Sequence, residues 1–102
     1  MTAIQHPRRD LDDLLTHAVR FSIAAALAAV ERAEFAAVRD SVEITPPTLS
    51  KQVALLEGAG YVHVEKGRVG RQPRTWLSLT QAGREAYGRH LAALRAIAGL
   101  PD

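Results

Sequence analysis

The sequence predicts a single α+β domain that is mostly helical and carries one β-hairpin. Two stretches with helical spacing of apolar residues flank a stretch in which apolar and polar residues alternate. The chain has 102 residues, which suits one hydrophobic core and is too short for two. Hydrophobic residues make up 47% of the chain and charged residues 24%, so wholesale disorder is excluded.

The N-terminal segment divides into an arm and the first predicted helix. Residues 1–9 are polar and show no period, so we expect a loose arm, followed by one domain over residues 10–99. From Leu11 onward, apolar and small residues recur at three- and four-residue steps, as on an amphipathic helix. We expect this helix to break near Thr16 or His17.

Two shorter helices follow, separated by a tight turn. The first is predicted over residues 34–42, and the second begins at Pro47 and ends before Gly60, which suits the left-handed residue after a helix. Three apolar residues of the second helix recur with helical spacing and define its buried side: Leu49, Val53 and Leu56.

The period then changes to that of a hairpin. Residues 61–65 and 75–79 alternate and are rich in β-formers, and residues 67–73 between them form a glycine- and arginine-rich turn that predicts a long tip. Thr80 is a suitable N-cap for a final long helix. The order helix, helix, turn, helix, hairpin, helix describes a winged helix-turn-helix with a two- or three-stranded wing.

The stretch from about Leu11 to Ala98 resembles small one-domain bacterial winged-helix regulators of the MarR, ArsR and PadR-like group. The resemblance implies a DNA-binding transcriptional regulator that dimerises through its terminal helices. It is carried by four strings: LDDLLTHAVR (11–20), TLSKQV (48–53), LEGAGYV (56–62) and GRQPRTWLSLTQAGR (70–84).

The helix that begins at Pro47 is the predicted recognition helix for the major groove. Helical geometry turns Pro47, Ser50, Lys51 and Ala54 away from the buried side. Lys51 can donate to guanine, Ser50 can pair with donors or acceptors, and the Pro47 ring or the Thr48 methyl can touch a thymine methyl. Thr48 and Gln52 flank this face and can reach phosphates or bases, with partial burial as the alternative for Gln52.

Two features of this region depart from the pattern of related sequences. Pro46 and Pro47 lack N–H groups, so the helix start loses two donors that can bind phosphate. Glu43 stands where related sequences often have glycine. If this position needs a positive φ, the side chain costs on the order of 1 kcal/mol, and it places an acid near DNA.

Charge is distributed unevenly along the chain, although the net charge is only +2. Residues 10–43 carry a net charge of −4, whereas residues 66–84 carry +5 and no acid. We assign four basic residues of the hairpin to phosphate or minor-groove contacts, with two at the tip and two at its base. These residues are Arg68 and Arg71 at the tip, and Lys66 and Arg74 at the base. We expect Trp76 to pack in the core rather than stack on a sugar.

Several chemistries are not expected. The chain has no cysteine, so disulfides, thiolate metal sites and cysteine nucleophiles are excluded. The four histidines show no metal-ligand spacing, and His90 is expected to be a surface or packing residue. No nucleophile motif, cofactor loop, secretory signal or membrane span is present. We therefore expect a cytoplasmic protein with no enzymatic activity, cofactor or metal.

The sequence thus predicts a homodimeric regulator, in particular a repressor, that binds double-stranded DNA. The alternative is a winged helix that uses the same face against another protein. No effector can be assigned, and a ligand would have to bind between the terminal helices or at the dimer interface. The predicted dimer interface comprises apolar residues of the terminal helices: Leu11, Leu14, Leu15, Leu91, Leu94 and Ile97.

Overall fold

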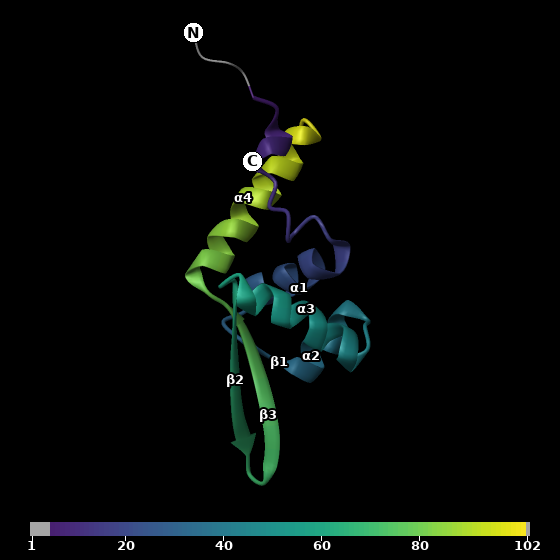
Figure 1. The fold of residues 1–102 in the computed structure, drawn as a ribbon, viewed down its shortest axis with the longest axis vertical. Helices are drawn as coiled ribbons and strands as arrows, with labels where there is room; N and C mark the ends of the chain where they lie inside the picture. The colour runs from purple at the N-terminus through teal and green to yellow at the C-terminus, as the bar shows by residue number, and fades with distance from the viewer. Residues whose placement is uncertain (1–4, 102) are drawn as a thin grey trace.

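The computed structural model describes residues 5–101 and confirms the winged-helix α+β fold class (Figure 1). Three helices form the body of the molecule, the hairpin projects from one end, and the last helix extends from the other. The elements are a 3-10 helix η1 (Pro7–Asp10), α1 (Ala18–Ala28), β1 (Ala33–Glu34), α2 (Phe35–Val42), α3 (Pro46–Gly58), β2 (Val62–Val69), β3 (Gln72–Leu79) and α4 (Gln81–Ile97).

The N-terminal segment is more ordered than the predicted arm and less helical than the predicted first helix. Residues 1–4 of that arm lie outside the described residues, whereas Pro7–Asp10 form η1, which contacts α4. Residues 13–16 form a turn because the Asp12 carboxylate accepts a hydrogen bond from the Leu14 N–H at 2.9 Å. The helix therefore begins only at Ala18, consistent with the predicted break.

A left-handed residue and two prolines shape the turn between α2 and α3. Glu43 has φ 60° and ψ 52°, and its N–H closes the end of α2. The positive φ considered from the sequence is thus present, at a residue with a Cβ. Helix α3 begins at Pro46, one residue earlier than predicted, because Thr45 is extended and its hydroxyl caps the Thr48 N–H at 3.3 Å.

The wing is a three-stranded antiparallel sheet in the order β1-β3-β2. Its hairpin strands are longer than predicted, because the ladder continues to the pair Val69 and Gln72 and leaves Gly70 and Arg71 as the connection. Gly70 has φ 62°, which a two-residue hairpin connection of this kind requires. The predicted long flexible tip is therefore replaced by a regular ladder with a tight turn.

Helix α4 begins in close contact with the start of the hairpin. The Thr80 hydroxyl accepts from the Gly83 N–H at 3.0 Å and donates to the Gly60 carbonyl at 2.6 Å, confirming the predicted N-cap. Gly83 is buried, and a Cβ at this position would lie 2.1 Å from the Tyr61 carbonyl oxygen. Only glycine therefore allows this approach without a backbone shift.

The hydrophobic core lies between α1, α2, α3 and one face of the sheet. Because the core is confined to this region, the hairpin and most of α4 project from it, and the molecule measures 63 × 23 × 22 Å. None of the helices described is long and apolar enough to cross a membrane. The largest fully buried side chains are Leu15, Ile23, Leu27, Val38, Leu49, Leu56, Leu77 and His90.

Candidate nucleic-acid interface

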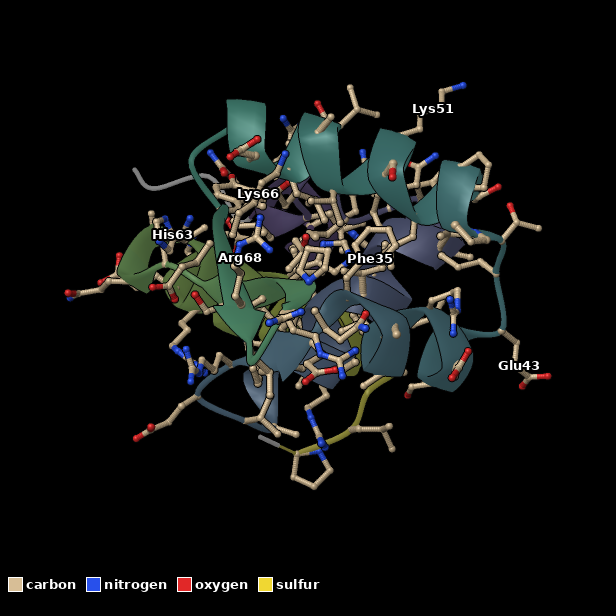
Figure 2. All side chains as sticks on the ribbon, turned by 90° about the horizontal axis from the view of Figure 1, so that it is seen from below. Phe35, Glu43, Lys51, His63, Lys66 and Arg68 are labelled. Atoms are coloured by element: carbon tan, nitrogen blue, oxygen red, sulfur yellow. The ribbon has the colours of Figure 1, made fainter. Side chains whose placement is uncertain are left out.

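The outward side of α3 presents the predicted recognition residues to solvent. Pro47, Ser50 and Lys51 are exposed, and Thr48 is half-buried. Lys51 points away from the body of the molecule (Figure 2). On the opposite side, Leu49, Val53 and Leu56 are buried as predicted, so packing against the core fixes which side of the helix faces solvent.

Gln52 takes the buried position that the sequence left as its alternative. Its side chain is only 8% exposed, and its amide oxygen accepts from the Arg20 guanidinium at 2.9 Å. The same guanidinium donates through Nε to the Leu14 carbonyl at 2.6 Å. Assignment of Gln52 to the DNA-contacting face is therefore corrected: this residue ties α3 to α1 through Arg20, which also bonds to the N-terminal turn.

Leu55 also belongs to the outward face, although the sequence did not point to it. It is 44% exposed and lies one turn after Lys51, beside the exposed Ala54. The helical geometry that selected Lys51 also turns Leu55 outward, to about 50° from the centre of the face. Its side chain has no charge and forms no hydrogen bond, so a pattern of polar residues on a recognition helix does not include it.

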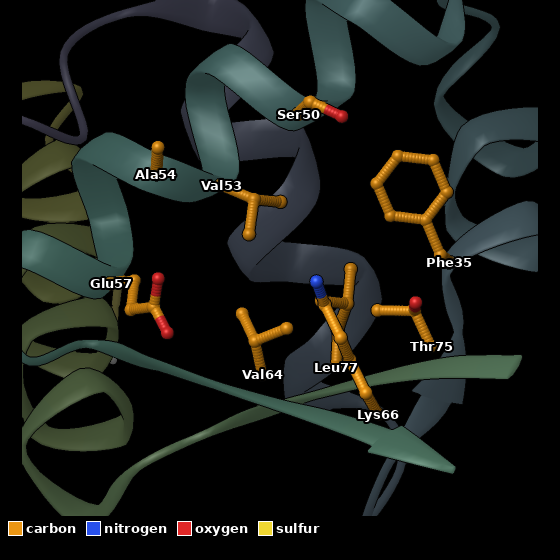
Figure 3. A pocket seen from close by; sticks show the side chains of 9 residues that line it. All are labelled: Phe35, Ser50, Val53, Ala54, Glu57, Val64, Lys66, Thr75 and Leu77. Carbon is orange, nitrogen blue, oxygen red and sulfur yellow. The ribbon is translucent and has the colours of Figure 1, made fainter.

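An open groove separates α3 from the wing, with Lys66 at its edge. The groove has a volume of about 440 Å³ and is bordered by Ser50 and Glu57 of α3 and by Lys66 and Thr75 of the hairpin. The Lys66 ammonium extends toward α3 (Figure 3). The other residues that line the groove are apolar: Phe35, Val53, Ala54, Val64 and Leu77.

The hairpin register divides the predicted wing residues between two faces. Lys66 and Arg68 are two residues apart on β2 and share the face that looks toward α3, whereas Arg74 pairs with Gly67 and points to the opposite face. There the Arg74 guanidinium lies 3.9 Å from the Glu34 carboxylate. Arg74 is therefore not brought together with Lys66 and Arg68.

Arg71 occupies the tip of the hairpin, as predicted. Its carbonyl accepts a hydrogen bond from the Arg68 guanidinium at 3.3 Å, and both side chains are exposed. Arg84, the last base of the positive stretch, instead donates to the carbonyls of Ala28 and Val30 at the end of α1. Lys66, Arg68 and Arg71 of the wing are thus exposed, while Arg84 serves the fold.

Trp76 does not pack in the core, so that expectation is wrong. Successive side chains of β3 alternate between faces, and Leu77 takes the core side. Trp76 is half-buried on the outer face, where the Arg32 guanidinium lies 4.1 Å from its ring centroid. This cation–π contact covers the indole, which would otherwise be exposed on the outer face of the wing.

Most of the predicted dimer residues remain accessible, with one exception. Leu15 is 2% exposed and belongs to the core, so its assignment to the interface is corrected. Leu11, Leu14 and Leu91 are half-buried, and Leu94 and Ile97 are exposed. Leu100, which was not among the predicted interface residues, is a further exposed apolar residue beyond the end of α4. We refer to Leu94, Ile97 and Leu100 as the apolar strip.

A partly buried hydrogen-bond cluster joins the N-terminal turn to α4 and to the end of α3. His90 is buried, as a packing residue, and its Nδ1 accepts from the Asp12 N–H at 2.9 Å. The Tyr61 hydroxyl donates to the Asp12 carboxylate at 2.5 Å. Burial lowers the pKa of the His90 imidazole, and the hydrogen bond to Asp12 raises the pKa of the Tyr61 hydroxyl.

Acidification from about pH 7.5 to about pH 5.5 is expected to lower the free energy of unfolding. The unfolded chain binds a proton on His90 near the ordinary value of about 6.5, whereas the folded chain, with its lowered pKa, resists protonation. The stability contributed by the buried, neutral imidazole of His90 is therefore fully present above about pH 6.5 and is lost as the pH falls below this value. Urea titrations followed by circular dichroism measure this loss.

The matched variants for this prediction are His90→Gln and His63→Gln, because His63 is exposed on β2. His90→Gln is expected to flatten the pH dependence, and His63→Gln is expected to retain it. An unchanged pH profile in His90→Gln would show that another group controls the dependence.

Among residues 5–101, no cluster of three side chains suited to holding a metal ion is found.

A comparison by sequence supports the architecture. The family model described as a winged helix DNA-binding domain matches residues 19–98, from the first turn of α1 to the end of α4. The matched segment therefore contains the whole of α2, α3 and the wing. No curated protein matches the chain by sequence.

Solved structures with the same fold include several regulators. A transcriptional regulator homologue protein from Pyrococcus horikoshii OT3 has a TM-score of 0.85 and 27% identity, covering 94% of this chain and 96% of that one. The M. tuberculosis transcriptional regulator MOSR, in complex with DNA, has a TM-score of 0.71 and 19% identity, covering 91% and 66%. A zinc-responsive MarR family member, Lactococcus lactis ZitR, has a TM-score of 0.62 and 20% identity, covering 80% and 56%.

Proposed function

Because the chain belongs to the family of winged helix DNA-binding domains, we propose that it binds duplex DNA sequence-specifically as a homodimeric transcriptional regulator. Its fold is that of MarR-family regulators. The observation that carries the proposal is the placement of three groups on one side of the molecule: the outward face of α3 with Lys51, and Lys66 and Arg68 on the α3-facing side of the wing.

In the proposed complex, α3 enters the major groove and the wing follows the adjacent backbone. Helix α3 has 13 residues, about 20 Å of helix, and the residues of its outward face are exposed. Lys66 and Arg68 then lie where the phosphates beside the groove pass, and Arg71 at the tip reaches the backbone or the minor groove. Phosphate contacts from the wing position the helix, and the helix reads the bases.

Dimerisation in this proposal uses the apolar strip at the far end of the molecule from the wing. Leu94, Ile97 and Leu100 are exposed there, and Leu11 of the N-terminal segment lines a pocket together with Leu94. Covering this strip with a second copy removes apolar surface from water. It also holds two recognition helices for half-sites about 34 Å apart. Such a dimer would repress by occupying a promoter and excluding polymerase.

The proposal is tested by binding to random-sequence duplex DNA between about 50 and 200 mM salt. Affinity is expected to fall steeply with salt, because phosphate contacts release counterions. Arg68→Ala is expected to weaken binding on every sequence and to reduce the salt slope by about 1 for each phosphate that Arg68 neutralises. Sedimentation of the free protein and of the complex gives the oligomeric state.

The control for Arg68→Ala is Arg74→Ala, which removes the same charge from the opposite face of the hairpin. It is expected to weaken binding less than Arg68→Ala. A protein that ignores duplex DNA even at about 50 mM salt, where phosphate contacts are strong, would contradict the proposed function. That result would favour the alternative in which this face binds another protein.

A further inference from the structure

The centre of the outward face of α3 contains one polar side chain among apolar residues. Measured from the buried side of the helix, 100° per residue places five residues within about 50° of the outward direction. All five are exposed, and only one of them, a lysine, can form a hydrogen bond through its side chain. These residues are Pro47, Lys51, Ala54, Leu55 and Gly58.

The polar residues of the helix lie elsewhere. Gln52 is buried and bonded to Arg20. Ser50 and Glu57 border the groove between α3 and the wing, and the hydroxyl groups of Thr45 and Thr48 bond to each other at 2.9 Å. Direct hydrogen bonding from the centre of the face is thus limited to Lys51.

This composition restricts the base edges that the face can accept. A guanine, cytosine or adenine edge placed against Leu55, Ala54 or Pro47 loses water from a polar group and gains no partner. Thymine differs from the other bases because its C5 methyl group is an apolar surface in the major groove. Contact between that methyl group and these side chains removes apolar surface from water on both partners.

We propose that the protein selects its sites by thymine C5 methyl groups. This inference rests on the proposed function, in which α3 enters the major groove. Leu55, Ala54 and Pro47 form the methyl-reading surface, and Lys51 contacts a guanine among these thymines. The neighbouring charges of Lys66 and Arg68 favour a duplex as the occupant of this face. The ligand class is therefore a thymine-containing half-site, read chiefly through apolar contacts.

Uracil in place of thymine removes only the methyl group and tests this inference. Duplexes are first selected from a random-sequence library by the full chain at low salt. The preferred duplex is then remade with a single uracil at each thymine position in turn. Binding is expected to weaken about fourfold at each contacted thymine, corresponding to about 0.8 kcal/mol for one buried methyl-sized group.

A double-mutant cycle assigns one of these thymines to Leu55. In Leu55→Ala, substitution by uracil is expected to lose its effect at one thymine of each half-site and to keep it elsewhere. The matched control is Val30→Ala, because Val30 is 42% exposed, nearly as much as Leu55, but lies after α1 rather than on α3. In this control the uracil effect is expected at every contacted thymine.

The outcomes separate this inference from the proposed function. A protein that binds no duplex contradicts the proposed function. A protein that prefers a selected duplex, but binds its uracil versions equally well at all positions, overturns the methyl-reading surface and leaves DNA binding intact. A uracil effect that persists unchanged at every thymine in Leu55→Ala overturns the assignment of Leu55.

Discussion

Replacing Gly83 with alanine is expected to destabilise the protein by about 3 kcal/mol, at the upper end of the usual cost of overpacking. The added Cβ would lie 2.1 Å from the Tyr61 carbonyl oxygen, a backbone atom that cannot move aside as a flexible side chain does. The same oxygen accepts a hydrogen bond from the Thr80 N–H at 3.0 Å. The substitution therefore strains the junction at which the hairpin meets α4.

Gly88→Ala is the matched control for this effect, because Gly88 lies in the same helix and a Cβ there meets nothing within 4 Å. It is expected to raise stability by up to about 1 kcal/mol, through the helix propensity of alanine. Urea unfolding and thermal melts compare the two variants. A Gly83→Ala protein as stable as the wild type would show that the junction can relax without cost.

The second large effect is expected for Lys51→Ala in DNA binding. Lys51 is the one side chain at the centre of the outward face of α3 that can donate a hydrogen bond. Under the proposed function, its loss costs about 1–3 kcal/mol at the contacted base pair, or roughly 5- to 150-fold in affinity for the preferred duplex. Random-sequence duplexes are expected to be bound with a much smaller change.

Comparison with Arg68→Ala separates base reading from phosphate contact. Lys51→Ala is expected to relax sequence preference and to change the salt slope less than Arg68→Ala does. Competition between the selected duplex and random duplex, at several salt concentrations, measures both quantities. Equal losses on every sequence would show that Lys51 contacts only phosphate.

The helices and the hairpin were predictable because their determinants are local. Apolar residues at helical spacing identify the buried side of α3, and Leu49, Val53 and Leu56 are buried there. The change of period after Gly60 identifies the hairpin, and Thr80 caps α4. Each of these features depends on residues within a few positions of one another, so the local amino-acid sequence is sufficient to predict it.

The errors concern residues whose role depends on a distant partner. Leu15 is apolar and near the N-terminus, but the core covers it. Gln52 lies between the two sides of α3, and Arg20 holds it inside. Trp76 alternates with Leu77, but alternation alone does not say which of the two faces the core. In each case the deciding contact comes from another element.

The division of wing charges shows the same limit for the candidate site. The positive stretch is plain in the sequence, but its arginines serve different purposes. Register places Arg74 on the face opposite Lys66 and Arg68, near Glu34, and Arg84 caps the end of α1. A one-residue shift in pairing would exchange these faces, and the two-residue connection at Gly70 fixes the pairing.

The sequence by itself determined the α+β class, the order of the elements, the buried side of α3 and the basic character of the wing. These follow from periodicity, turn chemistry and charge, which act over short distances along the chain. Only the tertiary structure decided which of the other side chains remain exposed: it buries Gln52 and Leu15, and it places Lys66 and Arg68 on one face of the wing. The physical reason is that exposure depends on which distant element packs over a residue, and spacing along the chain does not contain that information.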